Sequence, residues 1–325
     1  MGGDFAPSAP VEGAVLAARH AGVSLLLSGP RDEVGQELRR HLTDTGLDIR
    51  VVDAPDVVAM DEPSTSVLRA KRGASVRVAA EAVARGEADA LFSAGHTGAA
   101  VMAAHAAMGL LRGVERPALA ATIPTKSGTA VLLDAGANVE CRPQHLVQFA
   151  RLGRAYAKVA LGMREPRVGL LSIGAEESKG NELTRDAHQM LKGAEVNFIG
   201  NVEARDVFTG HADVIVCDGF TGNVALKVSE GTVEAVERLL ADELSRTWVT
   251  RLGLALTRRG LERFRRRLDY AEYGAAPLLG VGGLCLVGHG HSSARAVQSG
   301  ITMAARLVGE GLMARLAREV APDEV

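Results

Sequence analysis

The sequence predicts a doubly wound α/β fold, in which a mostly parallel sheet carries helices on both faces. Short apolar runs alternate with helical stretches through almost the whole chain, as in repeated strand–helix units. The chain is 47% hydrophobic but only 3% aromatic, so its core must be aliphatic. That composition suits a helix-covered parallel sheet better than a β-sandwich. The 325 residues are enough for one large or two medium domains.

The elements follow from apolar periodicity and from the glycine and polar residues that separate the runs. Strands are expected at Val23–Ser28, Ile49–Asp53, Ala90–Ser93, Leu119–Ile123, Ala130–Asp134, Val168–Ile173, Asn197–Ile199, Val214–Cys217 and Leu284–Val287. Helices are expected at Pro10–Ala21, Arg31–Thr45, Ser75–Arg85, Thr97–Leu111, Pro143–Leu161, Glu182–Leu191 and Ser292–Gly309.

The alternation stops between residues 223 and 270, where only helical spacing is found. A break near Gly253 predicts two antiparallel helices that project from the core as a hairpin arm. The expected organisation is therefore an α/β catalytic core, residues 1–222 and 271–325, with a helical arm at 223–270.

The predicted tip of the arm combines apolar and basic side chains: Trp248, Leu252, Leu254, Leu256, Arg258, Arg259 and Arg263. A basic amphipathic helix can lie on an anionic membrane surface or dock an acidic partner. The alternative is a solvated charged face that packs against another helix, including one from a second subunit. Both interpretations remain open.

Several classes of protein are excluded or disfavoured. Cys141, Cys217 and Cys285 are far apart and odd in number, so neither a metal site nor a disulfide framework is expected, which favours a reducing cytoplasm. The N-terminus does not resemble a signal peptide, and no uncharged stretch is long enough to span a bilayer. The net charge of −2 gives no general attraction to nucleic acid.

Five turns after predicted strands combine glycine with short polar side chains. They are residues 93–98, 134–138, 174–182, 218–223 and 288–292. Glycine lets the backbone approach a ligand closely, and successive N–H groups can cradle an oxyanion. Such turns meet at the carboxyl edge of an open sheet, so they predict one crevice for a phosphate-type ligand. The candidate binding residues are Gly95, Thr97, Gly98, Asn138, Gly180, Asn181, Gly222, His289 and Gly290.

Lys179 and Asn223 are the candidate catalytic residues. Lys179 lies between a strand and a helix, where it can hold a phosphate or a developing oxyanion; the alternative is an exposed loop lysine. Asn223 can donate its side-chain N–H at a helix start or serve only as an N-cap, and Asn138 has the same ambiguity. His289 can donate to a phosphate or be structural. Asp134 and Asp218 are expected to orient partners, because a carboxylate repels phosphate.

The common cofactor and nucleophile motifs are absent. The chain has no Gly-x-Ser-x-Gly elbow, no Gly-Lys pair of a Walker A loop, no His-Glu-x-x-His and no Gly-x-Gly-x-x-Gly. No nucleotide, metal or other cofactor is therefore expected.

The turns and their spacing resemble those of the phosphate acyltransferase family. The matching blocks are Met1-Gly2-Gly3-Asp4, Ser93-Ala94-Gly95-x-Thr97-Gly98, Arg116-Pro117-Ala118, Asp134-x-Gly136-Ala137-Asn138-Val139, Glu176-Glu177-x-Lys179-Gly180-Asn181-Glu182, Asn197 to Glu203, Cys217-Asp218-Gly219-Phe220-x-Gly222-Asn223, and Tyr270-x-Glu272-Tyr273-Gly274-Ala275-x-Pro277-Leu278-Leu279-Gly280. They cover essentially the whole chain.

The resemblance implies an enzyme of phospholipid synthesis that moves a fatty acyl group from acyl carrier protein to inorganic phosphate. It also implies a homodimer in the cytoplasm, with peripheral membrane contact and a downstream membrane acyltransferase as partner. Two departures stand out. The family has a short strand and an aspartate before Met-Gly-Gly-Asp, whereas this chain starts at Met1. His96 replaces an asparagine, and histidine can still donate a hydrogen bond.

Two further functions remain as alternatives. One is a phosphotransacetylase-like enzyme that uses acyl-coenzyme A. The other is a non-catalytic module that recruits acyl carrier protein to membranes through the arm.

Overall fold

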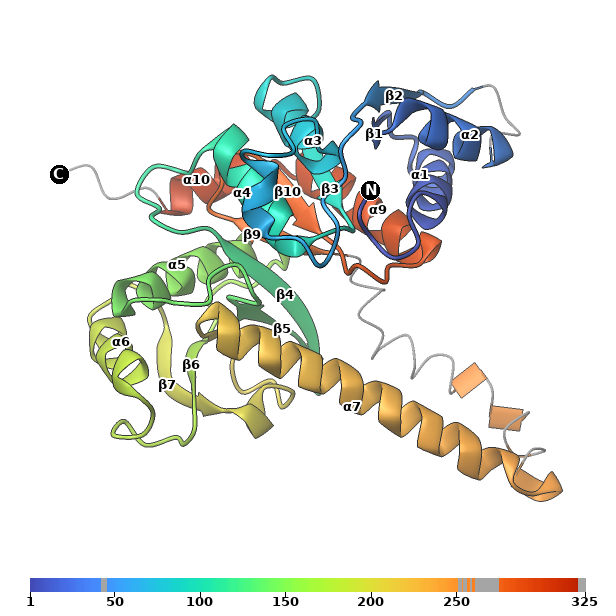
Figure 1. Ribbon diagram of the computed structural model, residues 1–325. Coiled ribbons are helices and arrows are strands. Elements are labelled where there is room, and N and C mark those ends of the chain that lie inside the picture. The colour runs from blue at the N-terminus through green and yellow to red at the C-terminus, as the bar shows by residue number, and fades with distance from the viewer. Residues whose placement is uncertain (42–45, 251–252, 254–255, 258, 261–274, 321–325) are drawn as a thin grey trace.

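The protein is a three-layer α/β molecule from which one long helix projects (Figure 1). The computed structural model describes residues 1–41, 46–250, 253, 256–257, 259–260 and 275–320. These residues form an eight-stranded sheet whose spatial order is β3 (Ala90–Ser93), β10 (Leu284–Val287), β9 (Ala276–Leu279), β4 (Ala118–Thr125), β5 (Gly128–Leu133), β8 (Val214–Val216), β6 (Val168–Ser172) and β7 (Phe198–Glu203). The strands β1 (Leu25–Gly29) and β2 (Ile49–Asp53) form a separate parallel pair.

The large sheet contains two parallel groups that run in opposite directions. β3 and β10 are parallel, and β5, β8, β6 and β7 are parallel to one another. Between them, β9 is antiparallel to both β10 and β4, and β4 is antiparallel to β5. The predicted mostly parallel sheet is confirmed. The carboxyl ends of β3 and β10, however, lie at the opposite edge from those of β5, β6 and β8.

The core is aliphatic and lies on both faces of the sheet. Along β5, Val131 and Leu133 belong to one buried cluster while Ala130 and Leu132 belong to the other, as the period of two along a strand requires. The first cluster packs under α5 (Pro143–Ala160), α6 (Glu182–Lys192), α9 (Ala294–Gly309) and α10 (Leu312–Val320). The second packs under α3 (Ser75–Ala84), α4 (Thr97–Met108) and the 3₁₀ turn η1 (Ser64–Val67).

The N-terminal helices complete the molecule beside the sheet. α1 (Ser8–Ala21) and α2 (Arg31–His41) pack with the β1–β2 pair around a small cluster that includes Val11, Val15, Val34 and Leu38. α1 also lies against α9. In Figure 1 this unit is at the upper right, beside the N-terminus.

Most predicted elements agree with the structure, and two were missed. The ranges of β2, β3 and β10 are as predicted, and the helices differ by a few residues at their ends. The sequence prediction missed β9 because this strand is short and contains Pro277, and proline is unfavourable within a strand. α10 was missed as well. The predicted end of the second helix, at residues 42–45, lies outside the described part of the chain.

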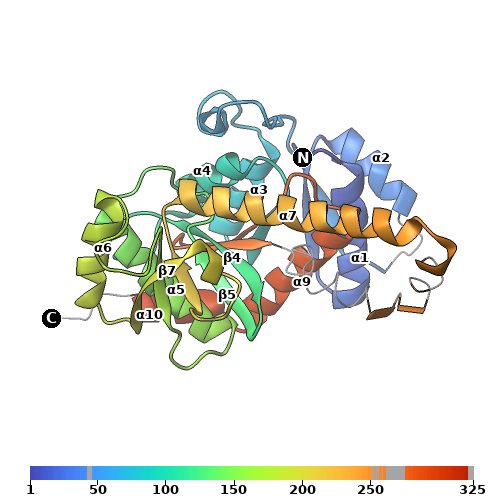
Figure 2. The same ribbon diagram turned by 90° about the horizontal axis from the view of Figure 1, so that it is seen from below.

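The helix that leads into the predicted arm is α7 (Gly219–Ser245), which has 27 residues. It begins four residues before the predicted boundary at 223, because Asp218 caps it: the Asp218 carboxylate accepts hydrogen bonds from Thr221 N and Thr221 Oγ1 at 2.8 and 2.7 Å. Figures 1 and 2 both show α7 extending beyond the core. The described helices include none that is long and apolar enough to cross a membrane.

We expect Phe149→Ala to lower the free energy of unfolding by about 3–5 kcal/mol, because Phe149 is fully buried in α5 under the sheet. Urea denaturation followed by circular dichroism measures the loss. Val139→Ala is the control, because Val139 is 67% exposed and its truncation should change stability by less than about 0.5 kcal/mol. Equal effects of the two changes would contradict the packing described for α5.

Candidate functional site

The carboxylate of Asp134 organises the turn after β5. It is fully buried, and its Oδ1 accepts hydrogen bonds from the backbone N–H groups of Leu119, Gly136 and Ala137 at 2.9, 3.1 and 2.9 Å. Its Oδ2 accepts from Asn138 N at 2.7 Å and from Asn138 Nδ2 at 2.8 Å. Burial raises the pKa of Asp134, and these donors oppose that rise. The turn is thereby fixed to β4, the neighbouring strand.

Asn138 links this turn to the start of α7. Its Nδ2 also donates to Pro117 O at 2.7 Å, so both amide hydrogens bond within the protein. The backbone carbonyl oxygen of Asn138 accepts a hydrogen bond from Gly219 N at 2.8 Å. A Cβ on Gly222 would lie 1.9 Å from Asp134 O, so only glycine allows α7 to approach this closely. The contacts of Asn138 and Gly222 therefore hold the β5 and β8 turns together.

Asn223 follows Gly222 and is exposed. It is not the N-cap of α7, since Asp218 has that position. The Asn223 side chain lies beside the β5 turn, with Cγ 3.6 Å from the place where a Cβ on Gly136 would be. The plain N-cap alternative for Asn223 is thus removed, and its catalytic role stays a prediction.

The turn after β6 carries Lys179. Its backbone N–H donates to Glu176 O at 3.0 Å, and its side chain is exposed. Gly180 has φ of 105°, a conformation that favours glycine. Asn181 caps α6, with its Oδ1 accepting from Thr184 N at 2.9 Å. These contacts shape the loop around Lys179 without engaging its ammonium group.

The turns after β3 and β10 form a second group, bridged by the N-terminal residues. Asp4 N donates to Gly290 O at 3.0 Å, and a Cβ on Gly3 would meet Ala94 O at 2.4 Å. Gly95 lies under Met1, whose carbonyl would be 2.7 Å from an added Cβ. Thr97 and Gly98 form the first turn of α4 and are half-buried.

His96 caps α4 and ties it to the preceding loop. Its Nδ1 accepts from Ala99 N at 3.3 Å and its Nε2 lies 3.0 Å from Glu62 O. Because Nδ1 accepts, Nε2 carries the proton and donates to Glu62 O.

The predicted single edge for all five turns is wrong, since the two strand groups run in opposite directions. α7 nevertheless connects the two sets of turns. It starts at the β5 and β8 turns, and Lys227, about 12 Å further along the helix axis, contacts Nε2 of His289 in the β10 turn. Glu230 lies 2.8 Å from Lys227 Nζ. Burial and then the Lys227 charge lower the pKa of His289. The sequence analysis did not identify Lys227 and Glu230 as residues near the site, because charged residues on a helix usually belong to its solvent-exposed face.

A large cavity of about 1410 Å³ lies along the opposite side of α7. It is lined by Gly180 and Asn181 of the Lys179 loop, by Cys217, Asp218 and Thr221 at the β8 turn, and by apolar residues of α7, β6 and the segment after β7. Phe220, Val224 and Val228 in its wall are 62%, 46% and 63% exposed. No pattern in the sequence indicates this cavity, because valines at helical spacing normally indicate packing against the core.

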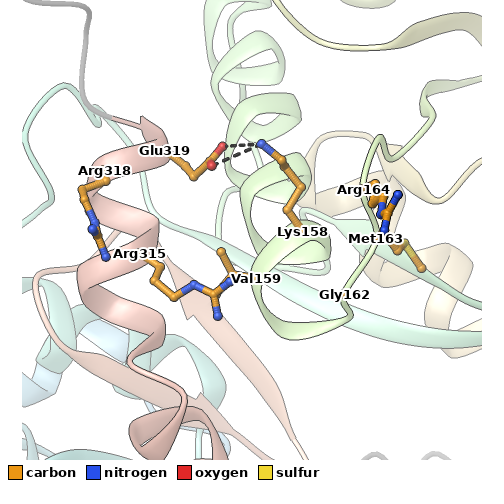
Figure 3. A pocket seen from close by; sticks show the side chains of 8 residues that line it. All are labelled: Lys158, Val159, Gly162, Met163, Arg164, Arg315, Arg318 and Glu319. Atoms are coloured by element: carbon orange, nitrogen blue, oxygen red, sulfur yellow. Dashed lines mark hydrogen bonds and ion pairs between the residues drawn. The ribbon is translucent and has the colours of Figure 1, made fainter.

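A second cavity, of about 600 Å³, lies between the end of α5 and α10 (Figure 3). Its side chains are mostly basic: Lys158, Arg164, Arg315 and Arg318, with Glu319 bonded to Lys158 at 3.0 Å. It precedes β6, so it lies at the other end of that strand from the Lys179 loop. None of the predicted site residues lines it.

The cysteines near the site are poor nucleophiles. Burial raises the pKa of Cys141 to about 12, and Asp134 adds to the rise. Burial also raises the pKa of Cys217 far above its ordinary value. Because the thiolate is the reactive form, neither residue supplies one near neutral pH.

The predicted arm tip is described only in part. Trp248 and Leu256 are 77% and 80% exposed, and Arg259 is also exposed. Leu252, Leu254, Arg258 and Arg263 lie outside the described residues.

Comparisons with known proteins give one consistent family. A family model described as "Fatty acid synthesis protein" matches residues 1–315. The chain is similar to the phosphate acyltransferase of Nitratidesulfovibrio vulgaris, with 48% identity over all of this chain and 94% of the relative. It is 46% identical to that of Acidobacterium capsulatum over 98% of this chain and 95% of the relative. Among solved structures, a phosphotransacetylase from Streptococcus pyogenes has a similar fold, with a TM-score of 0.62, 16% identity and coverage of 94% and 92%.

We expect Asp134→Asn to destabilise the protein by about 3 kcal/mol or more, because an amide N–H would face backbone N–H donors that a carboxylate accepts. Chemical denaturation measures the change. Asp186→Asn, an exposed change in α6, is the control and should be neutral. A variant at Asp134 with wild-type stability would contradict the organising role of this carboxylate.

Proposed function

Because the chain belongs to the phosphate acyltransferase family, we propose that it transfers a fatty acyl group from acyl carrier protein to inorganic phosphate. The full-length likeness to phosphate acyltransferases carries this proposal. The products are an acyl phosphate, which serves phospholipid synthesis, and the free carrier thiol. The enzyme is thus an acyl-group transferase, and the carrier donor is the proposed part.

The reaction needs no enzyme nucleophile. A phosphate group has a second pKa of about 6, so its dianion is abundant at neutral pH. A phosphate oxygen attacks the thioester carbonyl carbon, the carbon–sulfur bond breaks, and the thiolate leaves and takes up a proton. A thiol pKa of about 8.5 makes it an adequate leaving group. The raised pKa values of Cys141 and Cys217 support direct attack by phosphate over a cysteine-bound intermediate.

The protein then has to supply position and charge compensation. We assign Lys179 to the phosphate or to the developing oxyanion, since its ammonium is exposed at the loop that lines the large cavity. Asn223 is assigned as a second donor, because it is exposed on α7 beside the β5 turn. Asn138 and Gly222 act as positioning residues, since their contacts are internal.

The remaining phosphate-binding assignments are backbone and side-chain donors of the turns, namely Gly95, Thr97, Gly98, Gly180, Asn181, His289 and Gly290. His289 contacts Lys227, so the β10 turn has a neighbouring cation for an anionic ligand.

Acyl-coenzyme A is the alternative donor, favoured by the likeness of the fold to a phosphotransacetylase. A module that only recruits acyl carrier protein is the second alternative. It differs from both enzymes because it predicts tight carrier binding without phosphate-dependent turnover.

The arm is assigned to partners. Trp248 and Leu256 are 77% and 80% exposed, and Arg259 is exposed as well, a combination that suits peripheral contact with an anionic membrane. That contact would bring the acyl phosphate product to a membrane acyltransferase. A homodimer in which arms take part in the contact is also proposed, in the cytoplasm.

We expect phosphate-dependent consumption of palmitoyl-(acyl carrier protein), faster than that of palmitoyl-coenzyme A, with acyl phosphate as product. Lys179→Ala should lower kcat/KM by about a hundredfold or more while the fold survives, because it removes a cation from the oxyanion. Lys158→Ala, at the distant basic cavity, is the control and should keep full activity. Full activity in Lys179→Ala would remove this assignment, and faster use of the coenzyme A thioester would select the alternative donor.

For the arm, simultaneous Arg258→Glu, Arg259→Glu and Arg263→Glu changes should weaken binding to anionic vesicles by about a hundredfold, since each basic residue near such a surface contributes about 1 kcal/mol. Vesicle co-sedimentation measures this. Arg238→Glu, a single charge reversal on α7 before the tip, is the control for position. If the triple variant binds vesicles as well as the wild type does, the arm serves dimer packing or carrier docking instead.

A further inference from the structure

We propose that the large apolar cavity along α7 holds the hydrocarbon chain of the acyl donor, and that Val228 limits the length of chain that fits. This inference rests on the proposed transfer to phosphate, and it adds where the chain binds and which residue selects its length.

The cavity has the shape and length of a site for a long chain. Its lining follows α7 from Phe220 to Val233, which at 1.5 Å per residue is about 20 Å along the helix axis. A long fatty acyl chain can extend over that distance, whereas an acetyl group would leave nearly all of the cavity empty.

The lining is chemically divided along its length. One end is polar, with Ser172, Gly180, Asn181, Asp218 and Thr221. Elsewhere the lining is mainly apolar, with Leu171, Val207, Phe208, Val224 and Val228, and Ser229 and Thr232 of α7 add two hydroxyl groups. The charged residues that line the cavity are Lys126, Arg205 and Asp218. A thioester with a hydrocarbon tail has the same division, with its polar carbonyl at one end.

The polar end belongs to the candidate site, which fixes the orientation of the chain. Gly180 and Asn181 follow Lys179 directly, and Asp218 and Thr221, at the start of α7, lie within five residues of Gly222 and Asn223. The carbonyl therefore lies at the Lys179 loop, and the hydrocarbon tail extends along α7 toward Thr232 and Val233.

Ser172 supplies an independent observation at this end. Its hydroxyl is buried and has no hydrogen-bond partner among the described residues, which is costly for a polar group. The hydroxyl lies 2.9 Å from where a Cβ on Gly180 would be, so it lies directly under the loop that carries Lys179. A small displacement of that loop would let a carbonyl oxygen of the substrate accept from Ser172.

The exposed valines of α7 favour an apolar occupant. Val224 and Val228 are one helical turn apart, so both side chains face the cavity. Covering their exposed surface with hydrocarbon is favourable in proportion to the area removed from water. Val228 lies between the polar end and the distal end, where a larger side chain would shorten the space available.

The test is the chain-length profile of Val228→Phe. With carrier thioesters and saturating phosphate, kcat/KM for palmitoyl should fall by about tenfold or more, while that for octanoyl should change little. Val236→Phe is the matched control, because Val236 is 52% exposed on the same side of α7, two turns beyond Val228, and does not line the cavity. An unchanged ratio of palmitoyl to octanoyl turnover in Val228→Phe would overturn the inference.

If Val228→Phe loses turnover with both thioesters, Thr232→Phe decides. Thr232 lies one turn further from the polar end, so a selective loss of palmitoyl turnover supports the inference and an unchanged ratio overturns it. The alternative occupant is a second copy of the chain. A Val228→Phe variant that changes mass by sedimentation but keeps the wild-type profile would show that the partner covers this face.

Binding without turnover separates this inference from the proposed function. A fluorescent long-chain fatty acid should bind the wild type and be displaced by palmitate, with weaker binding in Val228→Phe but not in Val236→Phe. If the wild type forms no acyl phosphate from any thioester, the proposed function fails, yet this binding pattern still supports the cavity as a hydrocarbon site. Equal binding by both variants would overturn that assignment.

Discussion

The buried carboxylate of Asp134 is the constraint on which the site depends. Five N–H donors converge on its two oxygens, and they come from β4 and from the turn after β5. A charge in the interior is tolerated only when it is fully hydrogen-bonded, so these donors cannot be displaced singly without a large cost. Asn138 then transmits the constraint to Gly219, which fixes where α7 begins.

The second organising feature is the reversal of strand direction in the middle of the sheet. Antiparallel β9 and β4 separate two parallel groups, so two sets of glycine-rich turns lie at opposite edges. α7 brings them into contact, because it begins at one set and reaches His289 of the other through Lys227. The helix thus has two chemically different sides, with a polar side toward the β10 turn and an apolar side along the cavity.

The sequence predicts the elements well because apolar runs and glycine-rich turns are local signals, as at β2, β3 and β10. The direction of a strand in the sheet is not a local property. The direction of β10 relative to β4 depends on β9, and Pro277 makes β9 hard to predict from its sequence. The placement of the turns at two edges of the sheet therefore could not be predicted. The contacts of individual residues could not be predicted for a related reason. Lys227 and Val228 are adjacent on one helix, and spacing alone does not reveal that His289 faces one of them and a cavity the other. Asn138 was predicted as a ligand donor or an N-cap, and its internal bonding could not be foreseen because it depends on Pro117, which is distant in sequence.

The length of α7 has a mechanical consequence. Its 27 residues make a rod of about 40 Å, anchored at Gly219 and Gly222 and free of proline. Gly222 fits so closely against Asp134 O that the anchored end has little room to slide. If α7 tilts about this anchored end, the displacement is largest at Ser245. A force applied at Ser245 therefore acts as a torque on the first turn of α7, which carries Asn223.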